Sequence, residues 1–201
     1  MNIIKNTDIQ WAGGWYMDIH SYKSTRTPEG FNTDRSKIGQ ILYNYKYGKF
    51  LNGGGGKIRA ELATELADTM FNFIKSEDKL KYISTVSWVP SSKPRVNPVL
   101  EPIAIRLAKR IKCNCDELIT RKKNRESVKH KSQKEINEIL DDAFELNIQA
   151  CKSYDHKKVL LIDDLFRTGT TFKKIAKLIK DNSSICLYGL AITKTRTTSN
   201  D

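Results

Sequence analysis

The segment VLLIDDLFRTGTTFKKIAKLI, residues 159–179, constrains the fold more than any other part of the chain. It begins with an apolar run that ends at two adjacent acids, Asp163 and Asp164, and it continues through a turn rich in threonine and glycine into a segment with helical spacing. A short apolar run is typical of a buried strand, and a strand that leads into a helix is half of a β-α-β unit. The segment therefore predicts an α/β fold with both acids at the carboxyl end of a strand.

The rest of the chain continues this alternation of strands and helices. We expect strands within 11–25 and at 82–90, 115–120, 158–163 and 185–193, and helices at 35–47, 57–74, 98–111, 136–144 and 171–180. The stretch TRTPEGFNTD (25–34) predicts a turn-rich connection, and RKKNRESVKHKSQKE (121–135), which is almost wholly polar, predicts a mobile, exposed loop. This order of elements favours a mainly parallel sheet.

Length and composition favour one domain. A chain of 201 residues with 39% hydrophobic residues can bury one sizeable core, and two full domains would each be small. We expect residues 1–201 to form a single domain, with 1–50 as an N-terminal extension and 51–201 as the core.

The net charge of +12 favours an anionic partner, such as nucleic acid, an acidic membrane surface or a phosphorylated small molecule. Apolar runs stay well short of the roughly 18 residues of a membrane helix, and the N-terminus lacks the pattern of a signal peptide. We therefore expect a cytoplasmic protein that does not bind membranes. The four cysteines form no C-x-x-C pair, which favours reduced thiols over a zinc site or disulfides.

The acids and the turn that follows them suit a sugar phosphate. In open α/β sheets, ligands bind outside the carboxyl ends of the strands. Two neighbouring carboxylates can accept hydrogen bonds from the vicinal hydroxyls of a ribose, and a helix N-terminus with hydroxyls and backbone N–H groups can bind a phosphate. The alternative is that the acids cap the helix and the turn merely reverses the chain. A single cap explains one Asp or Thr, whereas this segment has two acids, three threonines and a glycine.

The run LLIDDLFRTGTT closely resembles the phosphoribosyl-diphosphate (PRPP) signature of type I phosphoribosyltransferases. The resemblance implies their Rossmann-like α/β fold, a mainly parallel sheet flanked by helices with a small hood from the terminal segments. It also implies that Asp163 and Asp164 hold the ribose hydroxyls. The 5-phosphate would lie in the loop of Arg167, Thr168, Gly169, Thr170 and Thr171. One departure from the pattern is that Phe166 and Arg167 stand where smaller residues are usual.

Other segments are similar to ComF-type phosphoribosyltransferases, a group named for a DNA-uptake competence protein. They are GWYMDIHSYKS (14–24), residues 35–48 with ILYNYKYG, the run WVPSSKPR (88–95) and the SQKEI…AF pattern before Asn147. ComF proteins often carry an N-terminal zinc finger rich in cysteine, and its absence from this sequence argues against a DNA-handling role. Asp18 and His20 lie in the first of these segments, and we expect them to be structural.

Two further segments supply candidate residues by the same resemblance. Residues 89–95 stand where this fold has its diphosphate loop, with Ser91, Ser92, Lys93 and Arg95 as donors; the alternative is a solvated turn. Residues 121–134 correspond to the flexible catalytic loop, with Arg125, Lys129, His130 and Lys131 as contributors. The alternative there is an ordinary charged loop or one that binds nucleic acid. His130 is a weaker candidate for a general base, because no carboxylate is visible to orient it.

We therefore expect an enzyme of nucleotide metabolism, a PRPP-dependent phosphoribosyltransferase that transfers 5-phosphoribosyl to a nitrogen nucleophile and releases diphosphate. Mg²⁺ would be bound through PRPP rather than directly by the protein. The alternatives are a non-catalytic sensor of PRPP or nucleotides, a nucleic-acid-binding protein, or a hydrolase or modifying enzyme with a different nucleophile. The sequence does not identify the acceptor or decide between a monomer and a homodimer.

Overall fold

A computed structural model describes residues 3–5, 8–28, 30–48, 56–91, 98–122 and 143–196. The strands are β1 (Gly13–Ile19), β2 (Ser21–Thr27), β3 (Gly30–Arg35), β4 (Thr85–Trp88), β5 (Asn114–Cys115), β6 (Ile119–Arg121), β7 (Phe144–Leu146), β8 (Lys158–Phe166) and β9 (Cys186–Lys194). The helices are α1 (Lys37–Tyr47), α2 (Gly56–Lys75), the 3-10 helix η2 (Asp78–Leu80), α3 (Glu101–Ile111), α5 (Ile148–Lys152) and α6 (Thr170–Asn182).

Five strands form one parallel sheet in the order β1-β9-β8-β4-β5. Its two central long strands are apolar: residues 159–162 of β8 and 187–193 of β9 are buried. Continuous apolar runs of this kind are expected where both faces of a parallel sheet are covered. The predicted α/β class, with a mainly parallel sheet flanked by helices, is confirmed.

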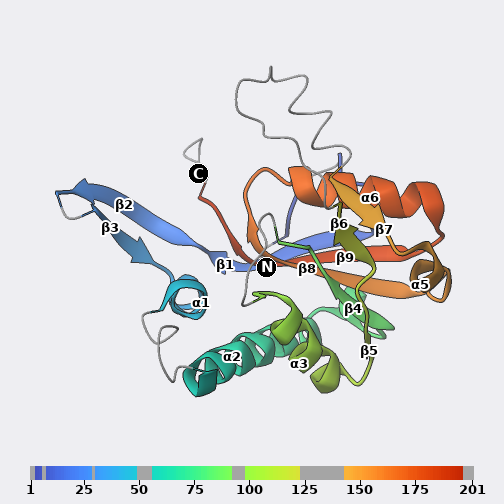
Figure 1. The fold of residues 1–201 in the computed structure, drawn as a ribbon, viewed down its shortest axis with the longest axis horizontal. Helices are drawn as coiled ribbons and strands as arrows, with labels where there is room; N and C mark the ends of the chain where they lie inside the picture. The colour runs from blue at the N-terminus through green and yellow to red at the C-terminus, as the bar shows by residue number, and fades with distance from the viewer. Residues whose placement is uncertain are drawn as a thin grey trace.

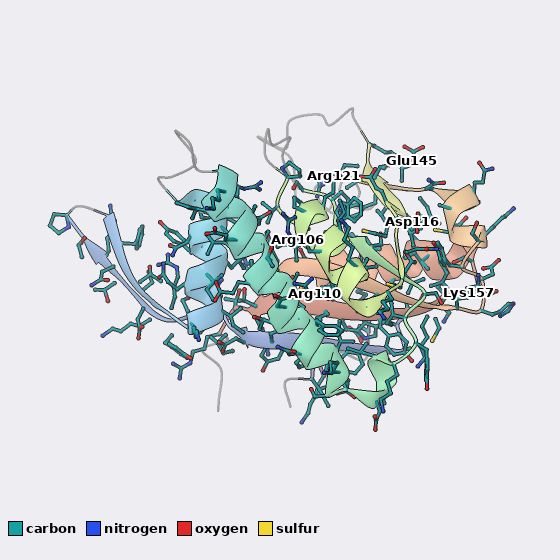
Figure 2. All side chains as sticks on the ribbon, turned by 90° about the horizontal axis from the view of Figure 1, so that it is seen from below. Arg106, Arg110, Asp116, Arg121, Glu145 and Lys157 are labelled. Carbon is teal, nitrogen blue, oxygen red and sulfur yellow. The ribbon has the colours of Figure 1, made fainter. Side chains whose placement is uncertain are left out.

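Helices cover both faces of this sheet. Figure 1 shows α6 on one face, and α2 and α3 together on the other. The two helices on the second face are joined by arginines of α3 that point toward α2 in Figure 2: Arg106 donates to Thr64 at 3.1 Å, and Arg110 forms an ion pair with Asp68 at 2.6 Å. This layering leaves the two ends of the sheet as the places where loops meet.

The N-terminal quarter of the chain contributes both to the sheet and to a projecting hairpin. The first strand, β1, pairs with β9, so part of the segment 1–50 lies in the central sheet. The next two strands, β2 and β3, pair with each other in an antiparallel hairpin that projects beside α1 (Figure 1). We expected a turn-rich connection at 25–34, which is wrong for most of its residues. The β-branched and aromatic residues among the turn formers extend both strands, which stay paired up to Thr27 and Gly30.

Other elements differ from the sequence-based prediction mainly at their ends. The helix expected from Pro98 starts at Glu101, with Pro102 in its first turn, and the strand expected to end at Asp163 continues to Phe166 because β9 pairs with it that far. The short helix α5 was not predicted. The helix expected at 136–144 lies outside the described residues except for its last two, of which Phe144 begins β7.

Two further findings concern the described chain as a whole. Among the residues that the structure covers, no helix combines the length and the apolar character needed to cross a membrane. The four cysteines, Cys113, Cys115, Cys151 and Cys186, are free thiols.

Candidate functional site

A hollow of about 250 Å³ lies at the carboxyl end of the parallel sheet. Because the strands are parallel, the segments that follow β4 and the last residues of β8 meet at the same edge, and α1, β6 and the segment before α3 complete the walls. The lining residues are Lys46, Val89, Pro90, Ser91, Val99, Leu100, Arg121, Asp163, Asp164, Leu165, Arg167 and Thr171. The hollow therefore brings together both predicted acids and two residues of the predicted phosphate loop.

Asp163 and Asp164 are partly buried residues of β8 that line this hollow. The Asp163 Oδ1 atom accepts a hydrogen bond from the backbone N–H of Asp164 at 2.8 Å. The backbone carbonyl of Asp164 accepts one from the Thr193 hydroxyl of β9 at 3.1 Å. The main chain of Asp164 is thus fixed from two sides, and one oxygen of the Asp163 side chain is held by its neighbour.

The two carboxyl groups have different electrostatic surroundings. Burial raises the pKa of Asp163 well above its ordinary value, and the nearby charge of Asp164 raises it further; the hydrogen bond from the Asp164 N–H and the charge of Lys46 oppose this only in part. Asp164 instead has a cation directly beside it. The two adjacent acids therefore differ: the Asp163 carboxyl is enclosed, whereas the Asp164 carboxylate forms an ion pair with a cation.

That cation is Lys46, which we did not predict. Its Nζ atom lies 2.6 Å from Asp164 Oδ2, and its side chain is only 12% exposed. The neighbouring Tyr45 donates its hydroxyl to the carbonyl of Val99 at 2.9 Å, so the last turn of α1 is tied to the wall of the hollow. A lysine near the end of an amphipathic helix gave no sign that it would reach an acid 118 residues away.

His20 and Thr193 form a second layer behind the acids. His20 Nδ1 lies 3.1 Å from Thr193 Oγ1, and the same hydroxyl donates to the Asp164 carbonyl. Burial lowers the pKa of His20, and the positive charges of Lys46 and Arg35 lower it further, so the neutral imidazole is favoured. The expectation of a structural role fits this position, and the hydrogen bond to Thr193 shows how His20 supports the site. Asp18 accepts a hydrogen bond from the N–H of Ile19 at 2.7 Å.

The predicted phosphate loop forms the turn between β8 and α6. Gly169, with φ of 78°, is the N-cap of α6, a conformation that favours glycine. The hydroxyls of Thr168 and Thr170 lie 2.9 Å apart, while Arg167 and Thr171 line the hollow. The alternative that the acids cap this helix is therefore wrong, because Gly169 occupies that position and the acids precede it in the strand.

The other predicted segments are described only in part. Ser91 is exposed and lines the hollow, whereas Ser92, Lys93 and Arg95 lie outside the described residues, as do Arg125, Lys129, His130 and Lys131.

Arg121, expected at the start of an exposed loop, instead ends β6, because residues 119–121 pair with 144–146 of β7. Its guanidinium lies 5.0 Å from the ring centre of Phe144, and it lines the hollow (labelled in Figure 2). Sequence reasoning took Arg121 as part of a charge run. Its partner strand β7 is short and lies far along the chain, so no local signal marked this pairing.

The acids offer oxygen ligands, the type that Mg²⁺ prefers. Within the described ranges, His, Cys, Asp and Glu side chains do not gather in groups of three or more that could hold a metal ion. One oxygen of Asp164 is already taken by Lys46. The donor set therefore fits a cation whose remaining ligands come from a bound substrate and water.

A comparison with protein families matches the part of the chain that carries the acids and the predicted phosphate loop. Residues 101–187 match the model of the family described as "Phosphoribosyl transferase domain". That range includes α3, Arg121, the acids of β8 and the whole turn into α6. No curated protein sequence matches the chain.

Three solved structures with low identity are similar to parts of the chain. A glutamine PRPP amidotransferase from B. subtilis, complexed with ADP and GMP, has a TM-score of 0.47 at 12% identity, covering 83% of this chain and 35% of that one. An allosteric regulatory enzyme of purine biosynthesis has 0.46 at 14%, covering 83% and 34%. A hypoxanthine phosphoribosyltransferase from Staphylococcus aureus has 0.39 at 17%, covering 67% and 64%. The chain thus spans about a third of the length of the first two.

The family match concerns the residues that carry the acids and the loop. Over residues 101–187, this protein is similar to phosphoribosyl transferase domains.

Proposed function

We propose that the protein is a PRPP-dependent phosphoribosyltransferase that transfers 5-phosphoribosyl to a nitrogen nucleophile. The observation that supports this most directly is the placement of Asp163, Asp164, Arg167 and Thr171 around one hollow at the carboxyl end of the sheet. The acids can accept hydrogen bonds from the ribose hydroxyls, and the turn at the start of α6 can receive the 5-phosphate.

In the proposed reaction, the lone pair of the acceptor nitrogen attacks C1 of the ribose. The bond between C1 and the diphosphate oxygen breaks, diphosphate leaves with the electron pair, and the acceptor nitrogen releases its proton to solvent. Arg121 and Ser91 line the same hollow as the acids, so they can contribute charge and a hydroxyl toward the departing diphosphate. Bound Mg²⁺ would neutralise part of the diphosphate charge. Arg125, Lys129 and His130 remain proposed contributors from the catalytic loop, and Ser92, Lys93 and Arg95 from the diphosphate loop.

The ComF-like subtype belongs to this proposal as well, on the resemblance of residues 14–24, 35–48 and 88–95. The second of these ranges contains Lys46, whose contact with Asp164 places that segment at the hollow. The acceptor itself is a nitrogen nucleophile of unassigned class, and a panel of purine, pyrimidine and amine acceptors assayed for diphosphate release would narrow it. Diphosphate released without any added acceptor would favour a hydrolase instead.

Calorimetry with PRPP and Mg²⁺ tests the proposal. We expect wild-type protein to bind PRPP and the double variant Asp163→Asn/Asp164→Asn to lose at least about tenfold in affinity, because a hydrogen bond to a charged acceptor such as Asp164 contributes about 1.5–3 kcal/mol. Asp78→Asn is the matched control, since Asp78 is an aspartate of η2 that is 89% exposed and outside the hollow. Equal affinities for wild type and the double variant would contradict the roles of the acids.

A second candidate function, nucleic-acid binding with or without catalysis, is favoured by the hairpin of β2 and β3. Arg26 of β2 stands directly opposite Phe31 of β3, and Phe31 is 74% exposed. Tyr22, which also belongs to β2, is 48% exposed. Exposed aromatic rings beside cations suit the bases and phosphates of single strands. The net charge of +12 agrees with this candidate.

A further inference from the structure

Lys46 occupies a place in the hollow that neither the sequence motif nor the proposed reaction explains. Its ammonium lies 2.6 Å from Asp164 Oδ2, and the lysine and aspartate side chains are 12% and 26% exposed. An ion pair between well-exposed groups is weak, because water and salt screen it. This pair is largely shielded from solvent, so its charges interact more strongly.

The position of this ammonium is set by the way α1 is anchored. Ser36 caps the helix by accepting from the N–H of Gly39 at 3.0 Å. The start of α1 lies so close to β1 that a Cβ on Gly39 would be 2.1 Å from the carbonyl oxygen of His20. At the other end, the hydroxyl of Tyr45 donates to Val99. The backbone of α1 is therefore anchored at Tyr45, directly before Lys46, so the position of the ammonium depends mainly on the lysine side chain.

The acid that it meets is fixed as well. The N–H of Asp164 donates to Asp163, and its carbonyl accepts from Thr193. The backbone of Asp164 is thus fixed on the wall of the hollow, and its Oδ2 atom forms an ion pair with Lys46. A divalent cation that approached the same oxygen would have to displace the ammonium or bind beside a positive charge.

The charges around the hollow add to this effect. Its described lining carries three cationic side chains, from Lys46, Arg121 and Arg167, and two acids, Asp163 and Asp164. Such a lining attracts a ligand with several negative charges and disfavours a free metal ion. A metal ion that arrives already bound to a phosphorylated ligand would bring its own compensating charge.

We propose that Lys46 is a built-in counter-ion of the acidic pair, which keeps the affinity of the empty hollow for free divalent cations low, so that the metal enters together with the anionic ligand. The identity of that ligand as PRPP rests on the proposed function, whereas the effect of Lys46 on the free metal ion does not. The role is one of positioning and charge control, and Lys46 takes no part in the bond changes.

Binding of Mn²⁺ alone, measured through the electron paramagnetic resonance signal of the free ion, tests the proposal without PRPP. Lys46→Met keeps the length and apolar part of the side chain and removes the charge. We expect this variant to bind Mn²⁺ at least about tenfold more tightly than wild type, since one unit charge next to the site is removed. Lys46→Arg keeps the charge and should stay close to wild type.

The matched control is Lys81→Met. Lys81 and Asp78 also form a lysine–aspartate pair at 2.6 Å, but both are exposed and outside the hollow, so this change should leave Mn²⁺ affinity unaltered. Circular dichroism verifies that each variant is folded. Equal Mn²⁺ affinities for folded Lys46→Met and wild type would overturn the proposal. If wild type fails to bind PRPP, the proposed function is refuted, and the comparison of Mn²⁺ affinities still decides the role of Lys46.

Discussion

At the scale of single residues, burial makes ionisation of the Asp163 carboxyl costly. Its raised pKa, caused first by burial and then by Asp164, means that the folded protein holds this proton more firmly than the unfolded chain does. Folded-state stability from this group is therefore fully present below the ordinary value of 3.8 and is lost as the pH rises through the raised value.

The variant Asp163→Asn tests this linkage. Asn can still accept from the N–H of Asp164 and cannot ionise, so at neutral pH we expect the variant to be more stable than wild type by about 1–3 kcal/mol, the range for a buried polar group without full pairing. Urea unfolding at several pH values gives the comparison. The difference between the two proteins should shrink as the pH falls toward 3.8. A difference independent of pH would contradict the raised pKa.

Sequence reasoning placed the acids on the strand before the turn, where the structure has them, but it did not find their partners. Adjacent acids after an apolar run have a local signal, because strand, turn and helix follow each other in the chain. Lys46 and Thr193 come from segments far from the acids in sequence, and nothing local marks a lysine or threonine that another element will meet. The three-dimensional path of α1 and β9 was needed to find them.

At the scale of elements, the position of α1 depends on its close approach to the end of β1. The space between Gly39 and the backbone of His20 is too small for a side chain, since a Cβ would be 2.1 Å from a carbonyl oxygen. Backbone atoms cannot swing aside as the end of a flexible side chain can. Because Gly39 has no Cβ, the helix that carries Lys46 can pack this closely against the end of β1.

Gly39→Ala should destabilise the protein by about 1–3 kcal/mol, the usual cost of forcing an extra carbon into a packed contact. Because the change pushes α1 away from β1 and Lys46 away from Asp164, it should also raise the affinity for Mn²⁺ alone, as Lys46→Met does. Gly56→Ala is the control: it is a helix residue with nothing within 4 Å of the added Cβ, so it should be neutral or slightly stabilising. Urea unfolding and calorimetry measure both effects. A neutral Gly39→Ala would show that the contact is loose.

Element types were easier to predict than element ends. Long periodic segments such as α2 and α6 were identified from their spacing, because one face of each packs on the core. The end of β8 was misjudged by three residues, since hydrogen bonds from β9 extend the strand past polar residues. Short elements such as α5 and β7 have too few residues for periodicity, and their structure depends on distant partners.

At the scale of the whole molecule, the hairpin of β2 and β3 and the net charge of +12 both favour nucleic acid as a partner. An isolated two-stranded hairpin is only marginally stable, so one that projects with exposed residues on both strands suits a role in contacts. The sequence-based prediction of a connection at residues 25–34 gives no indication of this surface. The pairing of Arg26 with Phe31 appears only once the register is known.

We expect the protein to bind single-stranded DNA or RNA with an affinity that falls steeply as salt is raised, because phosphate contacts release counter-ions. Fluorescence anisotropy at two salt concentrations measures this. Phe31→Ala should weaken binding by about 1–3 kcal/mol, the range for loss of one stacking ring. Tyr82→Ala is the control, since Tyr82 is 89% exposed and far from the hairpin in sequence. Weak binding that ignores salt would remove this candidate function.

The pairing of β1 with β9 limits the order in which the sheet can form during synthesis. The first strand of the sheet can find its neighbour only after the last one has left the ribosome, because the register joins Gly13 to Tyr188 and Ile19 to Lys194. Until then Trp15 and Met17, which end up buried, lack their final surroundings during synthesis. Closure of the sheet is therefore a late step, and in a nascent chain halted before β9 the strand β1 would remain without this partner.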